Sequence, residues 1–249
     1  MNVLALASHK GGAGKTTLAA HLAIAADTAG AGPVAVIDTD PQGSLTDWWN
    51  ERGTETVAFA HTHPSRINAD LKVLEAAGVA LVILDTPPAI ERSIASAVAA
   101  ADLTLIPVRP SPHDLRAAGA TLGMAERAGK PAAFVVNGAA QRAGITKDAI
   151  LSLSRAGPLA PVTIHHRTVF ADSMTDGRTA GEVKASSPAS QEIHRLWAFV
   201  AERLAQIASS PLQTETLSLA SARHGMAIRS VPRVRKTFGQ RGQERKYAA

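Results

Sequence analysis

The ten residues 8–17 constrain this chain more than any other stretch. They read Ser-His-Lys-Gly-Gly-Ala-Gly-Lys-Thr-Thr, and they lie between an apolar run at residues 3–7 and an apolar-rich segment at residues 17–26. The first flank is typical of a buried strand and the second of a helix. A glycine-rich turn between a strand and a helix is the setting of a phosphate-binding loop. The pattern therefore predicts a nucleotide-binding α/β fold.

The glycines of this turn suit phosphate binding because of their backbone freedom. They adopt conformations closed to other residues, so successive N–H groups can point at phosphate oxygens, and the following helix adds the positive end of its dipole. We expect Lys15 to reach the β- and γ-phosphates of ATP and the Thr16 hydroxyl to hold Mg²⁺. The expected nucleotide-binding residues of the loop are Lys10, Gly11, Gly12, Ala13, Gly14, Lys15, Thr16 and Thr17. The alternative is a glycine-rich turn with two solvated lysines.

The loop departs from the general pattern Gly-x-x-x-x-Gly-Lys-Ser/Thr, because His9 stands where the first glycine should be. It matches instead the variant Lys-Gly-Gly-x-Gly-Lys-Thr, which has a second lysine, Lys10, at its head. This variant resembles the deviant Walker A motif of the ParA/MinD ATPases. The resemblance implies that Lys10 crosses a dimer interface to the partner's nucleotide, and that it acts in catalysis together with Lys15.

Two acidic segments follow further predicted strands. Residues 33–37 predict a buried strand that ends in Asp38-Thr39-Asp40-Pro41-Gln42-Gly43, and residues 79–84 predict a central parallel strand that ends in Asp85-Thr86-Pro87-Pro88. Beside a Mg²⁺-nucleotide, paired carboxylates can organise the metal shell and orient the attacking water. The segments resemble switch I and the Walker B/switch II region of the same family, which implies that Asp38 and Asp85 support Mg²⁺ and that Asp40 positions the water. Alone, Asp-x-Asp before Pro and Gly also fits an ordinary turn.

The remaining periodicity predicts alternating strands and helices. Further strands are expected at residues 57–60, 103–108, 132–136 and 162–164, and helices at residues 44–52, 66–76, 91–101, 115–128, 146–156 and 188–207. Ser44 is the expected N-cap of the first of these helices, and Trp48 and Trp49 are interpreted as packing residues. His61 and His63 have the spacing of strand metal ligands without a third ligand, which favours a surface loop.

Two predictions near the end of the sheet depend on the resemblance. In relatives an Asn at the end of the corresponding strand hydrogen-bonds the adenine, and Asn137 resembles that residue; a turn-forming Asn before Gly138 is the alternative. Residues 164–170, followed by Gly177 and Glu182, are similar to a stretch whose backbone packs near the adenine in small ParA proteins.

Composition narrows the function. The chain has no cysteine, which excludes thiolate metal sites and iron–sulfur ligation. Of the net charge of +5, residues 209–249 carry +6, from six Arg and two Lys against two Glu. We therefore expect an ATPase domain at residues 1–208 and a flexible basic tail at residues 209–249. The candidate DNA contacts are Arg195, Arg203, Arg233, Arg235 and Lys236. No apolar run reaches the roughly 20 residues that span a bilayer, and sparse apolar residues in the tail argue against stable membrane association.

The resemblance covers residues 1 to about 207 and implies a P-loop NTPase with a mostly parallel, doubly wound sheet flanked by helices. It also implies a cytoplasmic, nucleoid-associated ATPase, slow alone, that forms a homodimer when ATP-bound. The dimer would bind nonspecific DNA and segregate or position plasmid, chromosome or protein-cluster cargo through a ParB-like activator. The chain begins at the first strand, so we expect no N-terminal helix-turn-helix domain. A MinD-like membrane-associated ATPase and a metabolic P-loop synthetase are the alternatives.

Overall fold

The computed structural model describes residues 1–54, 56–88 and 91–209. Their centre is one parallel sheet, with strand order β3-β2-β4-β1-β5-β6-β7. The strands are β1 (Asn2–Leu6), β2 (Val34–Asp38), β3 (Ala58–His61), β4 (Leu81–Asp85), β5 (Leu103–Val108), β6 (Ala132–Ala139) and β7 (Leu159–His165). The predicted α/β fold with its doubly wound parallel sheet is confirmed.

The central strands form because their side chains are apolar on both faces. Every residue of β2, β4 and β5 is buried, as continuous apolar runs in parallel sheets require. The edge strand β3 is only half-buried. Since β4 and β5 pair with opposite sides of β1, the chain reverses its direction of winding at β1, and ligands bind at the carboxyl ends of the strands at such a point.

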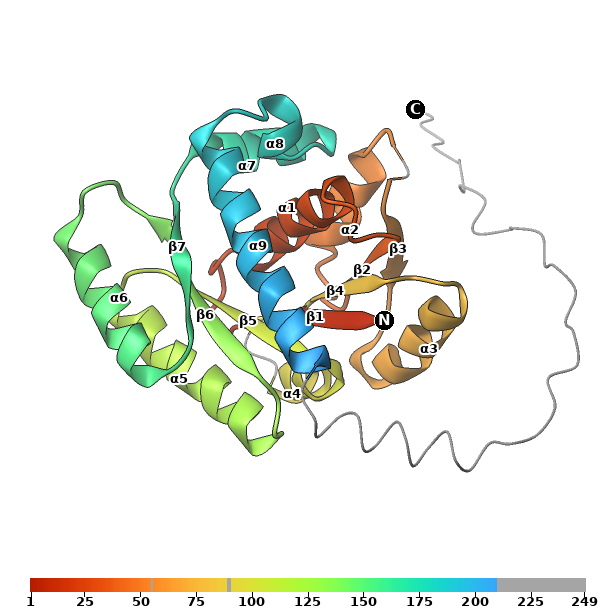
Figure 1. The fold of residues 1–249 in the computed structure, drawn as a ribbon, viewed down its shortest axis with the longest axis horizontal. Coiled ribbons are helices and arrows are strands. Elements are labelled where there is room, and N and C mark those ends of the chain that lie inside the picture. Colours follow the sequence, from red (N-terminus) through yellow and green to blue (C-terminus); the bar gives the residue numbers. More distant parts are fainter. Residues whose placement is uncertain (55, 89–90, 210–249) are drawn as a thin grey trace, which may run out of the picture. The chain divides into compact units, whose positions relative to one another are not determined.

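The longer helices lie on both faces of the sheet (Figure 1). They are α1 (Lys15–Thr28), α2 (Ser44–Glu51), α3 (Ile67–Ala76), α4 (Glu91–Ala100), α5 (Pro112–Arg127), α6 (Gly144–Ala156) and α9 (Pro188–Ala208). One core joins α1, α2 and α9 to the side chains of alternate strand residues such as Leu4 and Leu6. The alternate set, including Val3 and Ala5, packs with α3–α6 in two further clusters. Helices therefore shield both faces, and the strand ends remain open for a site.

Several boundaries differ from the sequence prediction. Ser44 is not the N-cap of α2: Gly43 holds that position in the left-handed conformation, with φ 69°, and Ser44 is the first helical residue. Helix α5 begins at Pro112 because Ser111 accepts a hydrogen bond from the Asp114 N–H and proline suits the first turn. Strand β7 is longer than predicted, because Pro161, a residue that argues against a strand, lies at an exposed position of this edge strand.

The chain between β7 and α9 forms short helical elements that the sequence analysis did not predict. These are α7 (Thr168–Asp172), the 3-10 turn η2 (Ser173–Asp176) and α8 (Ala180–Val183). A second 3-10 turn, η1 (Pro64–Arg66), leads into α3. Trp48 is 2% exposed and Trp49 packs against Phe59 with ring centroids 5.0 Å apart, so the packing role of both tryptophans is confirmed.

Candidate functional site

The glycine-rich loop lies between β1 and α1, as its sequence predicts. Gly12 and Gly14 adopt left-handed conformations, with φ of 73° and 90°, and Gly14 is the N-cap of α1. Such conformations strain residues that carry a Cβ. A Cβ at Gly14 would also lie 2.2 Å from Nδ2 of Asn137. The loop shape therefore requires glycine at position 14 for two independent reasons.

Side chains from the neighbouring strand ends and helices hold this loop in place. His9, which replaces the first glycine of the general motif, lies with its Nδ1 2.9 Å from the Thr121 hydroxyl of α5. Asn137 donates a 2.6 Å hydrogen bond from Nδ2 to the carbonyl oxygen of Ala13. The amide of Asn137 thus supports the loop directly, and its contact with adenine stays a prediction.

Buried charges gather where the loop enters α1. Lys15 is only 6% exposed, and burial lowers the pKa of its ammonium against the attraction of Asp85 and Asp40. The Thr16 hydroxyl donates a 2.6 Å hydrogen bond to Oδ2 of Asp85. Burial also raises the pKa of Asp85 to about 7, and the neighbouring Asp38 adds to the shift while the Thr16 bond opposes it. The three predicted residues Lys15, Thr16 and Asp85 are therefore brought together.

This cluster suits a Mg²⁺-nucleotide. Within the described residues, the buried Oδ1 of Asp85 has no hydrogen-bond partner, although buried polar atoms are nearly always paired. A hydroxyl and a carboxylate are oxygen ligands of the kind that Mg²⁺ uses beside phosphates. Residues Thr16 and Asp85 would hold Mg²⁺, directly or through water, and bound Mg²⁺ would neutralise charge on the phosphates.

Asp38 is bonded to the protein at both oxygens. Its Oδ1 accepts a 2.9 Å hydrogen bond from the Asp40 N–H, and its Oδ2 accepts hydrogen bonds from the Thr46 N–H at 3.0 Å and the Thr46 hydroxyl at 2.8 Å. These bonds fix the start of the loop that carries Asp40 and tie it to α2. The role of Asp38 toward Mg²⁺ stays a prediction.

Asp40 itself is half-buried and accepts a 2.9 Å hydrogen bond from the Gln42 N–H. The loop is joined to the end of β4 through Thr39, whose N–H and hydroxyl both donate to the Asp85 carbonyl oxygen, at 3.1 Å and 2.7 Å. Thr86 in turn donates to the Leu6 carbonyl oxygen at 2.9 Å. The two switch-like segments and the glycine-rich loop are therefore connected by a continuous set of hydrogen bonds.

The sequence analysis missed an ion pair that joins the end of α2 to α8. Arg52 lies just after α2 and is 7% exposed. Its Nη2 donates to Oε1 of Glu182 at 2.6 Å, and its Nη1 donates to Oε2 of Glu182 at 3.0 Å and to the Gly177 carbonyl oxygen at 2.9 Å. Burial alone would raise the pKa of Glu182, but the hydrogen bonds from Arg52 and Thr179 hold it below the ordinary value. The only feature of the sequence that could have indicated this region is the capping-box pattern Thr179-x-x-Glu182, which marks the start of α8.

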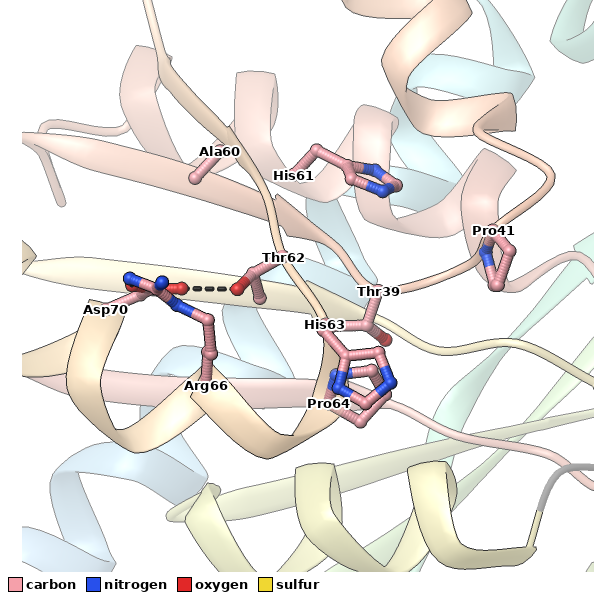
Figure 2. Close-up of a pocket in the computed structure, with 9 residues that line it drawn as sticks. All are labelled: Thr39, Pro41, Ala60, His61, Thr62, His63, Pro64, Arg66 and Asp70. Carbon is pink, nitrogen blue, oxygen red and sulfur yellow. Dashed lines mark hydrogen bonds and ion pairs between the residues drawn. The ribbon is translucent and has the colours of Figure 1, made fainter.

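A cleft of about 560 Å³ lies beside the Asp40 loop, between Thr39 and Pro41 on one side and the β3–α3 connection on the other. Figure 2 shows its lining side chains, with the Thr62 hydroxyl donating to Asp70. Asp70 also pairs with Arg66 at 3.5 Å. His61 is the last residue of β3, whereas His63 lies in the turn before η1. No group of three or more possible metal ligands occurs among the residues that the structure describes.

Two of the five predicted DNA contacts lie in the described part of the chain. Arg195 is exposed on α9, and Arg203 is half-buried there with Nη1 3.4 Å from Oε1 of Gln206. Arg233, Arg235 and Lys236 lie outside the described residues, as does all of the predicted basic tail at residues 209–249 except Ser209. Within residues 1–54, 56–88 and 91–209, no helix combines the length and apolarity needed to cross a membrane.

A parallel sheet with a glycine-rich loop at its centre, a buried lysine and a Thr–Asp pair beside it define a P-loop nucleotide-binding protein. The family described as the CobQ/CobB/MinD/ParA nucleotide binding domain matches residues 4–215. The chain belongs to this family, and it is a P-loop ATPase of the ParA/MinD type.

Relatives and solved structures agree with this assignment. "Maintenance of carboxysome distribution protein A" of Halothiobacillus neapolitanus is 31% identical over 207 residues, which cover 78% of this chain and 93% of that protein. The protein of the same name from Gloeobacter kilaueensis is 42% identical over 117 residues, 45% of this chain and 51% of its own length. The chain thus spans about half of that relative. The septum site-determining protein MinD of Pyrococcus horikoshii, solved with Mg-ADP, has the same fold, with a TM-score of 0.71 at 18% identity over 84% of this chain and 99% of that one.

Proposed function

We propose that this ATPase works as an ATP-dependent dimer switch. Two copies enclose two ATP–Mg²⁺, and Lys10 of each copy contacts the phosphates held by the other. The observation that carries the proposal is the contrast between the two lysines of the loop. Lys15 is buried at the start of α1, whereas Lys10 is exposed, and among the described residues its ammonium has no hydrogen bond or ion pair. A second cation beside the phosphate loop is then available to a neighbouring subunit.

The remaining site residues divide the work of hydrolysis. Lys15 and the N–H groups of the loop bind the phosphates. Thr16 and Asp85 hold Mg²⁺, and Asp38 supports the same metal ion. Asp40 orients the attacking water, as the water-positioning residues of other P-loop enzymes do. Asp40 is bonded to its own loop at Gln42, so hydrolysis is slow until an activator adjusts the loop. Adenine lies near Asn137 and the segment before α8.

The dimer binds nonspecific DNA and positions a cargo over the nucleoid in the cytoplasm, and a ParB-like activator on the cargo triggers hydrolysis and release. The names of the two relatives support a cargo of the protein-body kind, such as a carboxysome. The net charge of +6 on residues 209–249 supports a phosphate contact through Arg233, Arg235 and Lys236. Arg195 and Arg203 of α9 are further candidates, although α9 carries two Glu as well as two Arg. No stable membrane association is proposed.

The test compares Asp40→Ala and Lys10→Ala by light scattering with ATP and Mg²⁺. We expect Asp40→Ala to accumulate as a dimer because it binds ATP without hydrolysing it. Lys10→Ala should bind ATP but remain monomeric, while Lys147→Ala, an exposed lysine of α6, should dimerise like the wild type. An Asp40→Ala protein that stays monomeric with ATP contradicts the dimer switch.

DNA binding is tested on the full chain by sedimentation with nonspecific duplex DNA across a salt series. Replacing Arg233, Arg235 and Lys236 together by Gln should reduce the salt dependence, because each lost phosphate contact lowers its slope by about one. If the substitutions leave both affinity and slope unchanged, the tail does not contact DNA.

A further inference from the structure

Arg109 lies at the mouth of the phosphate-binding loop, although it belongs to none of the motifs of the sequence. It follows directly after β5, the strand that pairs with β1 on the side opposite β4. Its side chain is exposed. The carboxyl end of β5 and the loop after β1 lie at the same edge of the sheet, so the position alone brings Arg109 close to the nucleotide site.

The guanidinium of Arg109 lies next to Gly12, in van der Waals contact with the position that a Cβ of residue 12 would occupy. A Cβ built at Gly12 would be 3.5 Å from Nη1, 3.6 Å from Nη2 and 3.7 Å from Cζ, three nearly equal distances to one planar group. A Cβ built at Gly138 would be 3.7 Å from both Cγ and Nε of the same side chain. Arg109 therefore extends across Gly138 to Gly12. Both glycines have positive φ, of 64° and 73°, and the absence of their side chains leaves the path open.

The charge of Arg109 is not compensated inside the described part of the chain. Among residues 1–54, 56–88 and 91–209, no hydrogen bond or ion pair engages its guanidinium, although this group carries five N–H donors. Lys10 and Lys15 flank Gly12 in the same short loop, and the N-terminus of α1 adds partial positive charge. Asp85 and Asp40 attract Lys15, but among the described residues no acidic side chain pairs with Lys10 or Arg109, so the mouth of the loop favours an anion. Phosphate oxygens fit this need, because a guanidinium donates two parallel hydrogen bonds to them.

We propose that Arg109 binds the polyphosphate of the nucleotide held by its own subunit. This inference rests on the nucleotide-binding site proposed above. Arg109 and Lys15 then act on the phosphates from within one subunit, whereas Lys10 acts on those of the partner. Since neither ATP nor ADP binding requires the partner, Arg109 contributes to the affinity of the monomer for both.

The experiment measures the dissociation constants of fluorescent ATP and ADP analogues for full-length variants under conditions where the protein is monomeric. Arg109→Gln should weaken both by about tenfold or more, because it removes hydrogen bonds between charged groups. Arg109→Lys should recover part of the loss, since lysine keeps the charge but lacks the planar fork. Arg155→Gln is the matched control: Arg155 is exposed in the last turn of α6, just before the amino end of β7 and away from the carboxyl ends of the strands. Its substitution should leave both constants unchanged.

An Arg109→Gln protein that melts like the wild type without nucleotide and binds both analogues within about twofold of it overturns the proposal. Lys15→Ala separates this result from a failure of the site itself. If Lys15→Ala loses nucleotide and Arg109→Gln does not, only the role of Arg109 is wrong. If Lys15→Ala binds as tightly as the wild type, the nucleotide site is misplaced, and the inference about Arg109 fails with it.

Discussion

The buried carboxylate of Asp85 makes the stability of the nucleotide-free protein depend on pH. Its pKa is raised by burial from 3.8 to about 7, so between these values the folded state keeps a proton that the unfolded state has released. The contribution of Asp85 to stability therefore falls as pH rises from about 4 to about 7, and it levels off above pH 7. A difference of about three pKa units corresponds to about 4 kcal/mol.

Asp85→Asn removes this dependence, because an amide of the same shape does not titrate. We expect the free energy of unfolding of Asp85→Asn, relative to the wild type, to increase by about 4 kcal/mol from pH 4 to pH 8. The assay is urea denaturation without nucleotide or Mg²⁺ at several pH values. Any constant cost of the new amide cancels, since only the change with pH is compared.

Asp148→Asn is the control, because Asp148 is exposed on α6 and its substitution should give a difference that does not vary with pH. Adding ATP and Mg²⁺ should raise the free energy of unfolding of the wild type more than that of Asp85→Asn, since the variant lacks the metal-binding charge. A difference between Asp85→Asn and wild type that is flat, or that decreases toward pH 8, would refute the reasoning.

Three further predictions concern the supports of the site. Gly14→Ala should destabilise the protein by about 2 kcal/mol or more in thermal denaturation, because it combines a left-handed backbone with a clash against Asn137. In the double variant with Asn137→Ala, only the part of this lost stability that comes from the clash should be recovered. Arg52→Met should cost about 1–3 kcal/mol in urea denaturation, since it removes the hydrogen bonds of a buried guanidinium to Glu182 and the Gly177 carbonyl oxygen, whereas the surface substitution Arg178→Met should have no measurable effect. Burial lowers the pKa of His21 from 6.5 to about 4, so the contribution of His21 to stability should fall by about 3 kcal/mol as pH falls from 6.5 to 4. The free energy of unfolding of the wild type minus that of His21→Gln should decrease by this amount over that range, and a difference that does not vary with pH would contradict it.

The sequence predicts the parts of the site that depend on local order. Glycines between a strand and a helix, and an aspartate after a buried apolar run, have few other uses, so Lys15, Thr16 and Asp85 could be placed together before the structure was known. Their positions follow because parallel strands bring their carboxyl ends to one edge of the sheet. The identity of Gly43 rather than Ser44 as the cap of α2 depends on a backbone conformation that composition alone does not fix.

Contacts between distant segments could not be predicted in this way. Arg52 and Glu182 are 130 residues apart, and nothing in the neighbourhood of either residue identifies the other. The path of Arg109 across Gly138 and Gly12 likewise arises only when the ends of β1, β5 and β6 meet. A single sequence gives the motif residues, and tertiary packing decides which of them are still available for a ligand.

Helix α2 is held by hydrogen bonds at both of its ends. Thr46 in its first turn is bonded to Asp38, and Arg52 just beyond its last turn is bonded to Gly177 and Glu182. Because a short helix is stiff, a displacement of the Asp40 loop would move α2 as a rigid unit. The movement would then reach Gly177 and Glu182, to which Arg52 is hydrogen-bonded. We therefore expect the Asp40 loop and the region around Gly177 and Glu182 to move together.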